Sequence, residues 1–290
     1  MHLVIKTAYW FFSRLPLSVL QSIGSVTGSL MYHLLPSRRR VAFRNCKIIG
    51  VRDAESVVKS SFRNTFMSYM ETFYSKNVDE KFIGEMVDVE YIGGKPEDRG
   101  YFMVSAHFGG WELLSSLLTG KLGLKGAAVA RKIKDPKIDE FIQKQRKNSA
   151  VAYIHHRGAS DGIKEYMEKN LTIGVLLDHS SLEKDSLRIP FFGVTTTFMK
   201  AVPLLASRKN YPILPVFVLR RKKGFRMLVY PVIWPDRNLP PMERAENLAK
   251  RMNAVFEDVI RKHPDQWYLI HKRFKRTADE KGKLTVNLYD

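Results

Sequence analysis

Cysteine is almost absent from this chain, because Cys46 is the single one among 290 residues. One cysteine excludes an internal disulfide and a zinc site built from cysteines, and it favours a reducing compartment. We therefore expect Cys46 to be a small apolar side chain buried in the core.

Repeated long apolar runs are also missing. The mean hydropathy is −0.23 and 27% of the residues are charged, which excludes a multi-span membrane protein, since such a chain needs several apolar stretches of about 20 residues. The 44% of hydrophobic and 11% of aromatic residues nevertheless supply enough apolar surface for a sizeable core. This composition excludes disorder of the whole chain.

Acidic residues are scarce, with 29 Asp and Glu against 48 Lys and Arg, a formal charge of +19. Such a surplus indicates nucleic acid, an anionic membrane surface or a phosphorylated substrate as partner. The first acidic residue is Asp53, so the N-terminal end is uniformly basic. Its aromatic and aliphatic neighbours favour a membrane over nucleic acid, because basic arms that bind nucleic acid are usually polar.

The N-terminal segment has no charged side chain from residue 15 to residue 37, and it lies between an aromatic group at 9–12 and three arginines at 38–40. Serines, glycines and Pro16 dilute it, so a single membrane span and a helix lying in the interface both stay open. We expect residues 1–40 to be this membrane-anchoring or interfacial segment, with the arginine side cytoplasmic. Residues 41–290 are expected to form the second domain.

Apolar runs and helical patterns alternate along the rest of the chain. Buried strands are predicted at 101–105, 172–177 and 213–219, and helices at 53–74, 135–147, 161–169, 196–208 and 243–262. Residues 225–234 are expected to pair with 213–219 as a hairpin through the turn 221–224. The alternation predicts an α/β fold, a single domain with a central mixed sheet flanked by helices and an N-terminal hydrophobic membrane-associating helix.

His107 is the first candidate for chemistry, because it follows a predicted buried strand, where α/β sheets bind ligands. Gly109 and Gly110 allow a tight turn, so Glu112 can bend back toward the imidazole. A carboxylate there would leave the other ring nitrogen free to take a proton from a hydroxyl, which is general-base chemistry. On spacing alone, a core histidine satisfied by a helix carboxylate is the alternative.

A metal site is not expected. The His-Glu-x-x-His pattern is absent and no second cysteine exists, so the known zinc patterns are not met.

Several ordered blocks give the chain a family resemblance. It resembles the late acyltransferases of lipid A biosynthesis, the lauroyl and myristoyl transferases within the lysophospholipid acyltransferase superfamily. The blocks are the His-x4-Glu motif at 107–112, the strand that ends in Asp at 176–179, the Pro-Phe-Phe-Gly and threonine segment at 189–197, and the closing signatures at 264–268 and 271–274. The resemblance extends from the N-terminal segment to about Arg276, which makes residues 41–290 an acyltransferase domain.

The resemblance implies transfer of a fatty acyl chain from acyl carrier protein, or acyl-CoA, to a hydroxyl of a lipid A precursor, without an acyl-enzyme and without a bound cofactor. His107 is then the general base and Glu112 its orienting partner. Asp178 and one arginine correspond to polar residues of the family's site. Arg131 and Arg146 are the two candidates for this arginine. The alternative for Asp178 is that its side chain only caps the following turn. The alternative for Arg146 is that it is only a solvated residue of a helix.

The attack of a hydroxyl on a thioester creates an oxyanion. We expect the backbone N–H groups of Gly109 and Gly110, or an arginine, to stabilise it. Arg131, with Lys132 and Lys134, is placed to meet phosphates, and a solvated basic face is the alternative.

The expected partners are anionic membrane lipid, a phosphorylated glycolipid acceptor and acyl carrier protein, with no nucleic acid. The expected location is the cytoplasmic face of the bacterial inner membrane, as a single-span or peripheral protein. The alternatives are a superfamily member that acts on another glycolipid or a lysophospholipid, and a non-catalytic basic protein that binds membranes.

Overall fold

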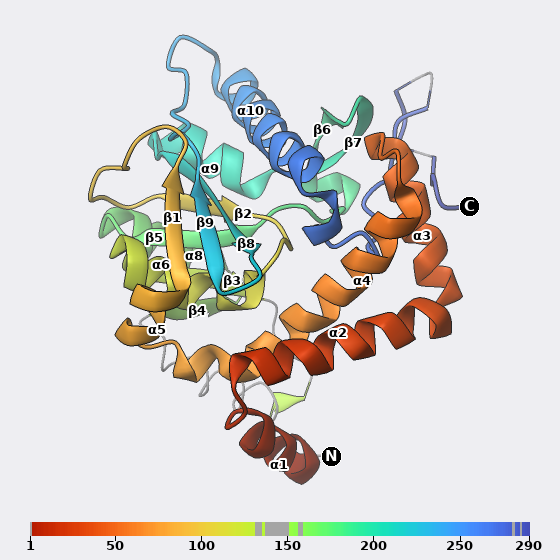
Figure 1. Ribbon diagram of the computed structural model, residues 1–290. Helices are drawn as coiled ribbons and strands as arrows, with labels where there is room; N and C mark the ends of the chain where they lie inside the picture. The colour runs from red at the N-terminus through yellow and green to blue at the C-terminus, as the bar shows by residue number, and fades with distance from the viewer. Residues whose placement is uncertain (1, 131–134, 137–150, 156–158, 280–281, 285) are drawn as a thin grey trace.

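The computed structural model describes residues 2–130, 135–136, 151–155, 159–279, 282–284 and 286–290 (Figure 1). The described helices are α1 (His2–Phe12), α2 (Leu17–Leu34), α3 (Pro36–Ile49), α4 (Ala54–Glu71), α5 (Glu80–Met86), α6 (Leu114–Leu122), α8 (Ala159–Glu168), α9 (Ala201–Lys209) and α10 (Pro241–Lys262). The strands are β1 (Val87–Tyr91), β2 (Phe102–Ser105), β3 (Gly126–Ala130), β4 (Val151–His155), β5 (Thr172–Leu176), β6 (Ser186–Phe191), β7 (Val194–Met199), β8 (Ile213–Arg220) and β9 (Phe225–Val229).

A seven-stranded sheet with the order β1-β9-β8-β2-β5-β3-β4 forms the centre of the fold. Its strands pair in parallel except β8 and β9, which form an antiparallel hairpin. The turn of this hairpin contains Gly224 with φ at +72°, a conformation that glycine adopts without a steric penalty. The expected α/β fold with a mixed central sheet flanked by helices is therefore confirmed.

The central strand β2 sends its side chains alternately into two hydrophobic cores. Phe102 and Val104 belong to the core that also contains the buried faces of α8, α9 and α10. Tyr101 and Met103 belong to the core formed with α5 and α6. Because both faces of β2 are covered, all four of its residues are buried, and the three before Ser105 are apolar, as is usual for strands of buried parallel sheets.

Cys46 lies in the larger core and is fully buried. The expectation of a small side chain buried in the core is therefore confirmed. Burial also raises the pKa of its thiol to about 12, which disfavours the reactive thiolate.

The predicted helix at 196–208 is wrong over its first part. The threonines of β7 pair with β6 in a separate two-stranded antiparallel sheet, and helix α9 begins only at Ala201. β-branched threonines fit a pleated strand better than a helix, and the turn at Phe192 and Gly193, both with positive φ, closes this hairpin. Most of the predicted helix 135–147 lies outside the described residues.

Helix α2 packs along α4, on the side of the molecule away from the sheet (Figure 1). A Cβ on Gly24 would lie 2.6 Å from the Met67 Cα atom, and one on Gly28 would lie 2.6 Å from the Phe62 carbonyl oxygen. The two helices can approach this closely only because both positions are glycine. The glycines that make residues 15–37 a poor membrane span are therefore the residues through which α2 contacts α4.

The opposite face of α2 is exposed and apolar. Val19, Val26, Leu30 and Leu34 are each more than two fifths exposed, and their spacing places them on one side of the helix. Within the described part of the chain, no helix combines the length and the apolar character needed to cross a bilayer.

Candidate active site

His107 lies two residues beyond the end of β2, and a buried carboxylate holds it there. Its Nδ1 atom is 2.8 Å from Asp178 Oδ1, and its backbone N–H donates to Asp178 Oδ2 at 3.1 Å. Asp178 follows β5, the parallel neighbour of β2. Because the carboxyl ends of parallel strands meet at one edge of a sheet, two residues far apart in the sequence come into direct contact.

Asp178 is 2% exposed and its side chain also accepts a hydrogen bond from Trp267 Nε1 at 3.1 Å. This position differs from the sequence expectation, which gave the orienting contact to Glu112. The Glu112 side chain accepts instead from Trp111 Nε1 at 3.1 Å. Both residues lie in the short 3₁₀ turn Trp111–Leu113, which directs the Glu112 carboxylate toward its neighbour on the same turn.

The charges around His107 favour its protonated form. Burial opposes a charge on the imidazole, but the Asp178 charge, the hydrogen bond to Asp178 and the charge of Glu112 outweigh it and raise the pKa of His107. Burial likewise opposes ionisation of Asp178, yet His107 and the nearby histidines lower the pKa of this carboxyl far below its ordinary value. The pair is thus an imidazole held by a permanently ionised carboxylate.

Two further histidines stack behind His107. The ring centroids of His107 and His179 are 4.0 Å apart with an angle of 2° between the planes, and those of His179 and His271 are 4.0 Å apart at 21°. Burial lowers the pKa of His179 to about 4 and that of His271 to about 3, and the charge of buried Arg273 adds to both effects. Both rings are therefore neutral near pH 7. His179 and His271 lie in two of the blocks that carry the family resemblance, 176–179 and 271–274, but their spacing in the sequence does not predict the stack.

One group in the described part of the chain has the composition of a metal site. The ligand atoms of His107, Asp178 and His179 lie within 4.8 Å of one another. An imidazole, however, binds a metal through a nitrogen lone pair that lies in the plane of its ring. The planes of His107 and His179 are parallel, so one ion cannot lie in both, and this arrangement of the side chains does not fit a shared metal.

The loop that follows His107 is fixed by backbone hydrogen bonds. Gly109 N–H donates to the Gln266 carbonyl at 2.9 Å, and Gly110 N–H donates to the Val218 carbonyl at 3.0 Å. Both N–H groups are used within the fold, so neither is free in this structure to donate to an oxyanion. The alternative, an arginine, stays a prediction. Gly109 itself has φ at +53°, and a Cβ there would lie 1.9 Å from the Val218 oxygen.

A buried ion pair beneath this loop was not anticipated from the sequence. The Arg220 guanidinium donates to both carboxylate oxygens of Glu71, at 2.8 and 2.7 Å, and also to the Gly109 carbonyl at 3.1 Å. Ser68 donates to the same carbonyl and accepts from Arg220 at 2.8 Å. Strand β8, helix α4 and the His107 loop therefore form one hydrogen-bonded unit.

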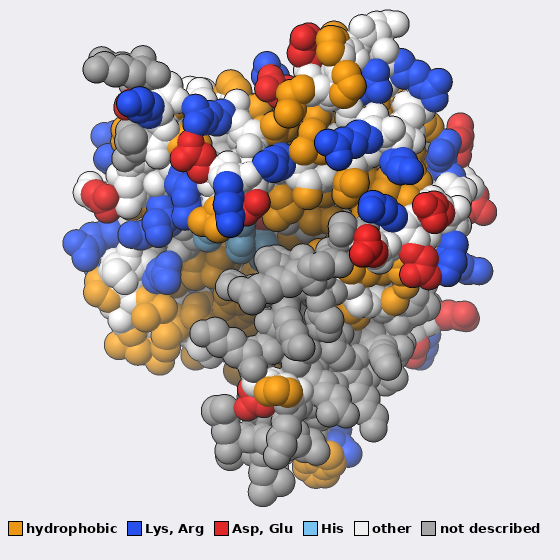
Figure 2. All heavy atoms as spheres, turned by 180° about the vertical axis from the view of Figure 1, so that it is seen from behind, with side chains coloured by type: hydrophobic (Ala, Val, Ile, Leu, Met, Phe, Trp, Pro, Cys, Tyr) orange, Lys and Arg blue, Asp and Glu red, His pale blue; other side chains and the backbone are white. Residues whose placement is uncertain are grey.

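The exposed side of His107 opens into a hollow with aromatic walls. Trp111 and Tyr268 lie 5.6 and 5.7 Å from the imidazole, centroid to centroid, and the Tyr69 and Tyr268 hydroxyls are 2.9 Å apart. Figure 2 shows histidine side chains on the floor of this hollow, with Lys and Arg along one side and hydrophobic side chains below. The His107 side chain is 22% exposed, so a substrate can reach it. Arg131 and Arg146 lie outside the described residues.

Comparison with known proteins gives a consistent result. The model of the family described as bacterial lipid A biosynthesis acyltransferase matches residues 2–276. A lipid A biosynthesis lauroyltransferase of Escherichia coli K12 is 26% identical over 92% of this chain and 88% of its own length. A lipid A biosynthesis acyltransferase of Haemophilus influenzae is 28% identical over 95% of this chain and 89% of its own length.

Among solved structures, a 1-acyl-sn-glycerophosphate acyltransferase from Thermotoga maritima matches 82% of this chain and 98% of its own. The identity is 17% and the TM-score 0.36.

Proposed function

This chain belongs to the bacterial lipid A biosynthesis acyltransferase family and is an O-acyltransferase, and from this premise we propose that it transfers a fatty acyl chain from acyl carrier protein to a hydroxyl of a phosphorylated lipid A precursor. Acyl-CoA is the alternative donor. The donor is a co-substrate, so the proposed reaction needs no resident cofactor.

In this proposal His107 is the general base. The carboxylate of Asp178 holds a proton on Nδ1, so Nε2 is the nitrogen that takes the proton from the acceptor hydroxyl. The hydroxyl oxygen attacks the thioester carbonyl, the tetrahedral intermediate collapses, and the carbon–sulfur bond breaks. The thiolate leaves with the proton that His107 has taken, so an ester and a free thiol are formed and the histidine is neutral again.

The observation that carries this mechanism is the 2.8 Å contact between His107 Nδ1 and buried Asp178 on an imidazole that is still reachable from outside. A buried carboxylate selects one tautomer and stabilises the imidazolium that forms during the attack. Glu112 acts through its charge on His107 rather than by a hydrogen bond to it. It also holds the indole of Trp111, which faces the imidazole.

The membrane attachment we propose is peripheral and uses the outer faces of α1 and α2. Trp10, Phe11, Val26 and Leu30 are each more than half exposed. The first acidic residue of the chain is Asp53, so no carboxylate on these two helices opposes anionic head groups. An apolar helix face with cations beside it is the pattern of a helix lying in the membrane interface.

The reaction is tested with purified protein, labelled acyl carrier protein or acyl-CoA, and three acceptors: a phosphorylated lipid A precursor, another glycolipid and a lysophospholipid. We expect transfer to the first acceptor, and we expect His107→Ala to reduce it by about 10³-fold or more. His33→Ala is the matched control, because His33 is exposed on α2. Transfer to the lysophospholipid alone would contradict the acceptor, and failure with all three would contradict the reaction.

The attachment is tested by sedimentation with anionic vesicles. Leu30→Asp is expected to release the protein, because it places a charge on the apolar face. Met242→Asp is the control, since Met242 on α10 is 55% exposed and Leu30 is 54% exposed. Equal release by both variants would mean that the face of α2 is not the attachment surface.

A further inference from the structure

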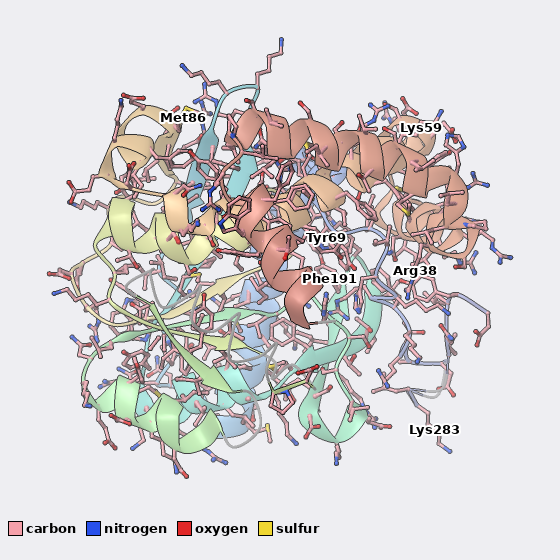
Figure 3. All side chains as sticks on the ribbon, turned by 90° about the horizontal axis from the view of Figure 1, so that it is seen from below. Arg38, Lys59, Tyr69, Met86, Phe191 and Lys283 are labelled. Atoms are coloured by element: carbon pink, nitrogen blue, oxygen red, sulfur yellow. The ribbon has the colours of Figure 1, made fainter. Side chains whose placement is uncertain are left out.

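A pocket with a basic lining lies at the far end of the histidine stack. Its volume is about 470 Å³, and its lining includes His271 and four cationic side chains, Arg38, Lys272, Lys275 and Arg276. Arg38 comes from the first turn of α3 and the others from the segment that follows Trp267. Figure 3 labels Arg38 on the side of the molecule where the C-terminal segment with Lys283 lies.

The cations of this pocket lack carboxylate partners. None of the four takes part in an ion pair among the described residues, and no Asp or Glu belongs to the lining. Arg276 donates to the Ser180 hydroxyl at 3.3 Å, a neutral group that leaves its charge uncompensated. Like charges around one cavity repel one another, so an anion bound there would relieve the repulsion.

The start of helix α3 adds to this positive potential. Among the described residues no side chain caps α3, and its first turn contains no acidic residue. Ser37 and Arg38 of this first turn line the pocket. A helix N-terminus carries a partial positive charge and free N–H groups, which together favour an anion.

The pocket is also close to the reacting group. His271 lines it and stacks on His179 at 4.0 Å, and His179 stacks on His107 at 4.0 Å. The charge of Arg38 also acts on Tyr69 in the wall of the hollow, where it lowers the pKa of the phenol. Burial and the hydrogen bond to Tyr268 outweigh this effect and raise the pKa overall. A single imidazole, that of His179, therefore separates the ring that lines the pocket from the imidazole of His107.

We propose that this pocket binds a phosphate group of the lipid acceptor and so places the acceptor hydroxyl at His107, a proposal that rests on the proposed function. Arginine and lysine side chains with helix N–H groups are the donors that phosphate prefers. The volume leaves room for the sugar that carries the phosphate. The residues differ from those named in the sequence analysis, because Arg131, Lys132 and Lys134 lie outside the described residues.

The test combines two variants with two acceptors. Arg38→Gln and Lys275→Gln are made together, because both side chains are exposed and neither is part of a hydrophobic core. The control is Lys222→Gln with Lys223→Gln, which removes the same charge from the exposed turn between β8 and β9. Steady-state kinetics are measured with the phosphorylated lipid A precursor and with the same lipid after phosphatase treatment.

We expect the pocket variant to raise KM for the phosphorylated acceptor about tenfold with kcat unchanged, and to leave KM for the dephosphorylated acceptor and for the donor unchanged. A rise in KM for the donor would assign the pocket to the donor's phosphate and overturn the proposal. Equal effects on both acceptors, or an equal effect of the control, would also overturn it, because they would indicate general attraction to an anionic surface.

A binding measurement separates this proposal from the proposed reaction. Inorganic pyrophosphate is expected to raise the melting temperature of the wild type and of the control variant, and to have at least a several-fold weaker effect on the pocket variant. Equal stabilisation of all three proteins, or of none, would contradict an anion site in the pocket. Failure of the wild type to acylate either lipid would refute the proposed function while leaving this measurement valid.

Discussion

Replacing Asp178 by asparagine is the sharpest test of the site, because Glu112→Gln makes the same chemical change on the carboxylate that the sequence favoured. Asp178 holds His107 through contacts of 2.8 and 3.1 Å, whereas the Glu112 carboxylate accepts a hydrogen bond from Trp111. A hydrogen bond to a charged group contributes about 1.5–3 kcal/mol, which corresponds to roughly a 10- to 150-fold change in rate.

The amide has a further effect, because its NH₂ group can face Nδ1 and select the wrong tautomer of His107. The same change in Ser-His-Asp sites costs about 10⁴-fold in kcat. We therefore expect Asp178→Asn to lower kcat by about 10²- to 10⁴-fold, and Glu112→Gln by less than about tenfold. Circular dichroism and the melting temperature of each variant show whether the fold is retained.

The pH profile gives an independent measurement. The base acts in its neutral form, so the rate falls as the pH drops through the raised pKa of His107. Removing the Asp178 charge lowers this pKa, and the acid limb of kcat/KM moves to lower pH. A smaller shift in the same direction is expected for Glu112→Gln. The reasoning is refuted if Glu112→Gln costs as much in kcat as Asp178→Asn, or moves the limb as far.

Two further predictions concern the support of the site. Gly109→Ala is expected to destabilise the fold by about 1–3 kcal/mol or more, because its Cβ would meet the Val218 oxygen. Urea denaturation measures this loss, with Gly94→Ala as the control, because Gly94 has a positive φ but open space around it. Equal losses in the two variants would contradict the close contact at Gly109. Glu71→Gln is expected to lower the free energy of unfolding by about 3–5 kcal/mol, because it leaves the Arg220 charge buried without its partner. A variant as stable as the wild type in the same urea denaturation would show that this ion pair does not hold the loop.

The sequence predicted where His107 lies in the fold, but not which carboxylate contacts it. A buried run before His107 was enough to place this residue at the carboxyl end of a strand. The spacing to Glu112 then suggested a partner, since residues five apart can meet around a turn. The actual partner is 71 residues away, and the parallel pairing of β2 and β5 that brings it there is a property of the sheet as a whole.

Other features were missed for similar reasons. The strand Gly126–Ala130 consists mostly of small residues, which carry little strand signal. Glu71 and Arg220 are 149 residues apart, and neither lies in a recognisable motif. Their contact depends on how α4 crosses the end of the sheet, which local patterns do not encode.

The close packing of α2 on α4 has a geometric consequence. Gly24 and Gly28 join the two helices backbone to backbone, and α4 in turn holds the His107 loop through Ser68 and Glu71. If α2 rests on the bilayer as proposed, the imidazole stands at a constant height above the lipid surface. The enzyme would then select among the hydroxyls of one lipid by how far each projects from the membrane.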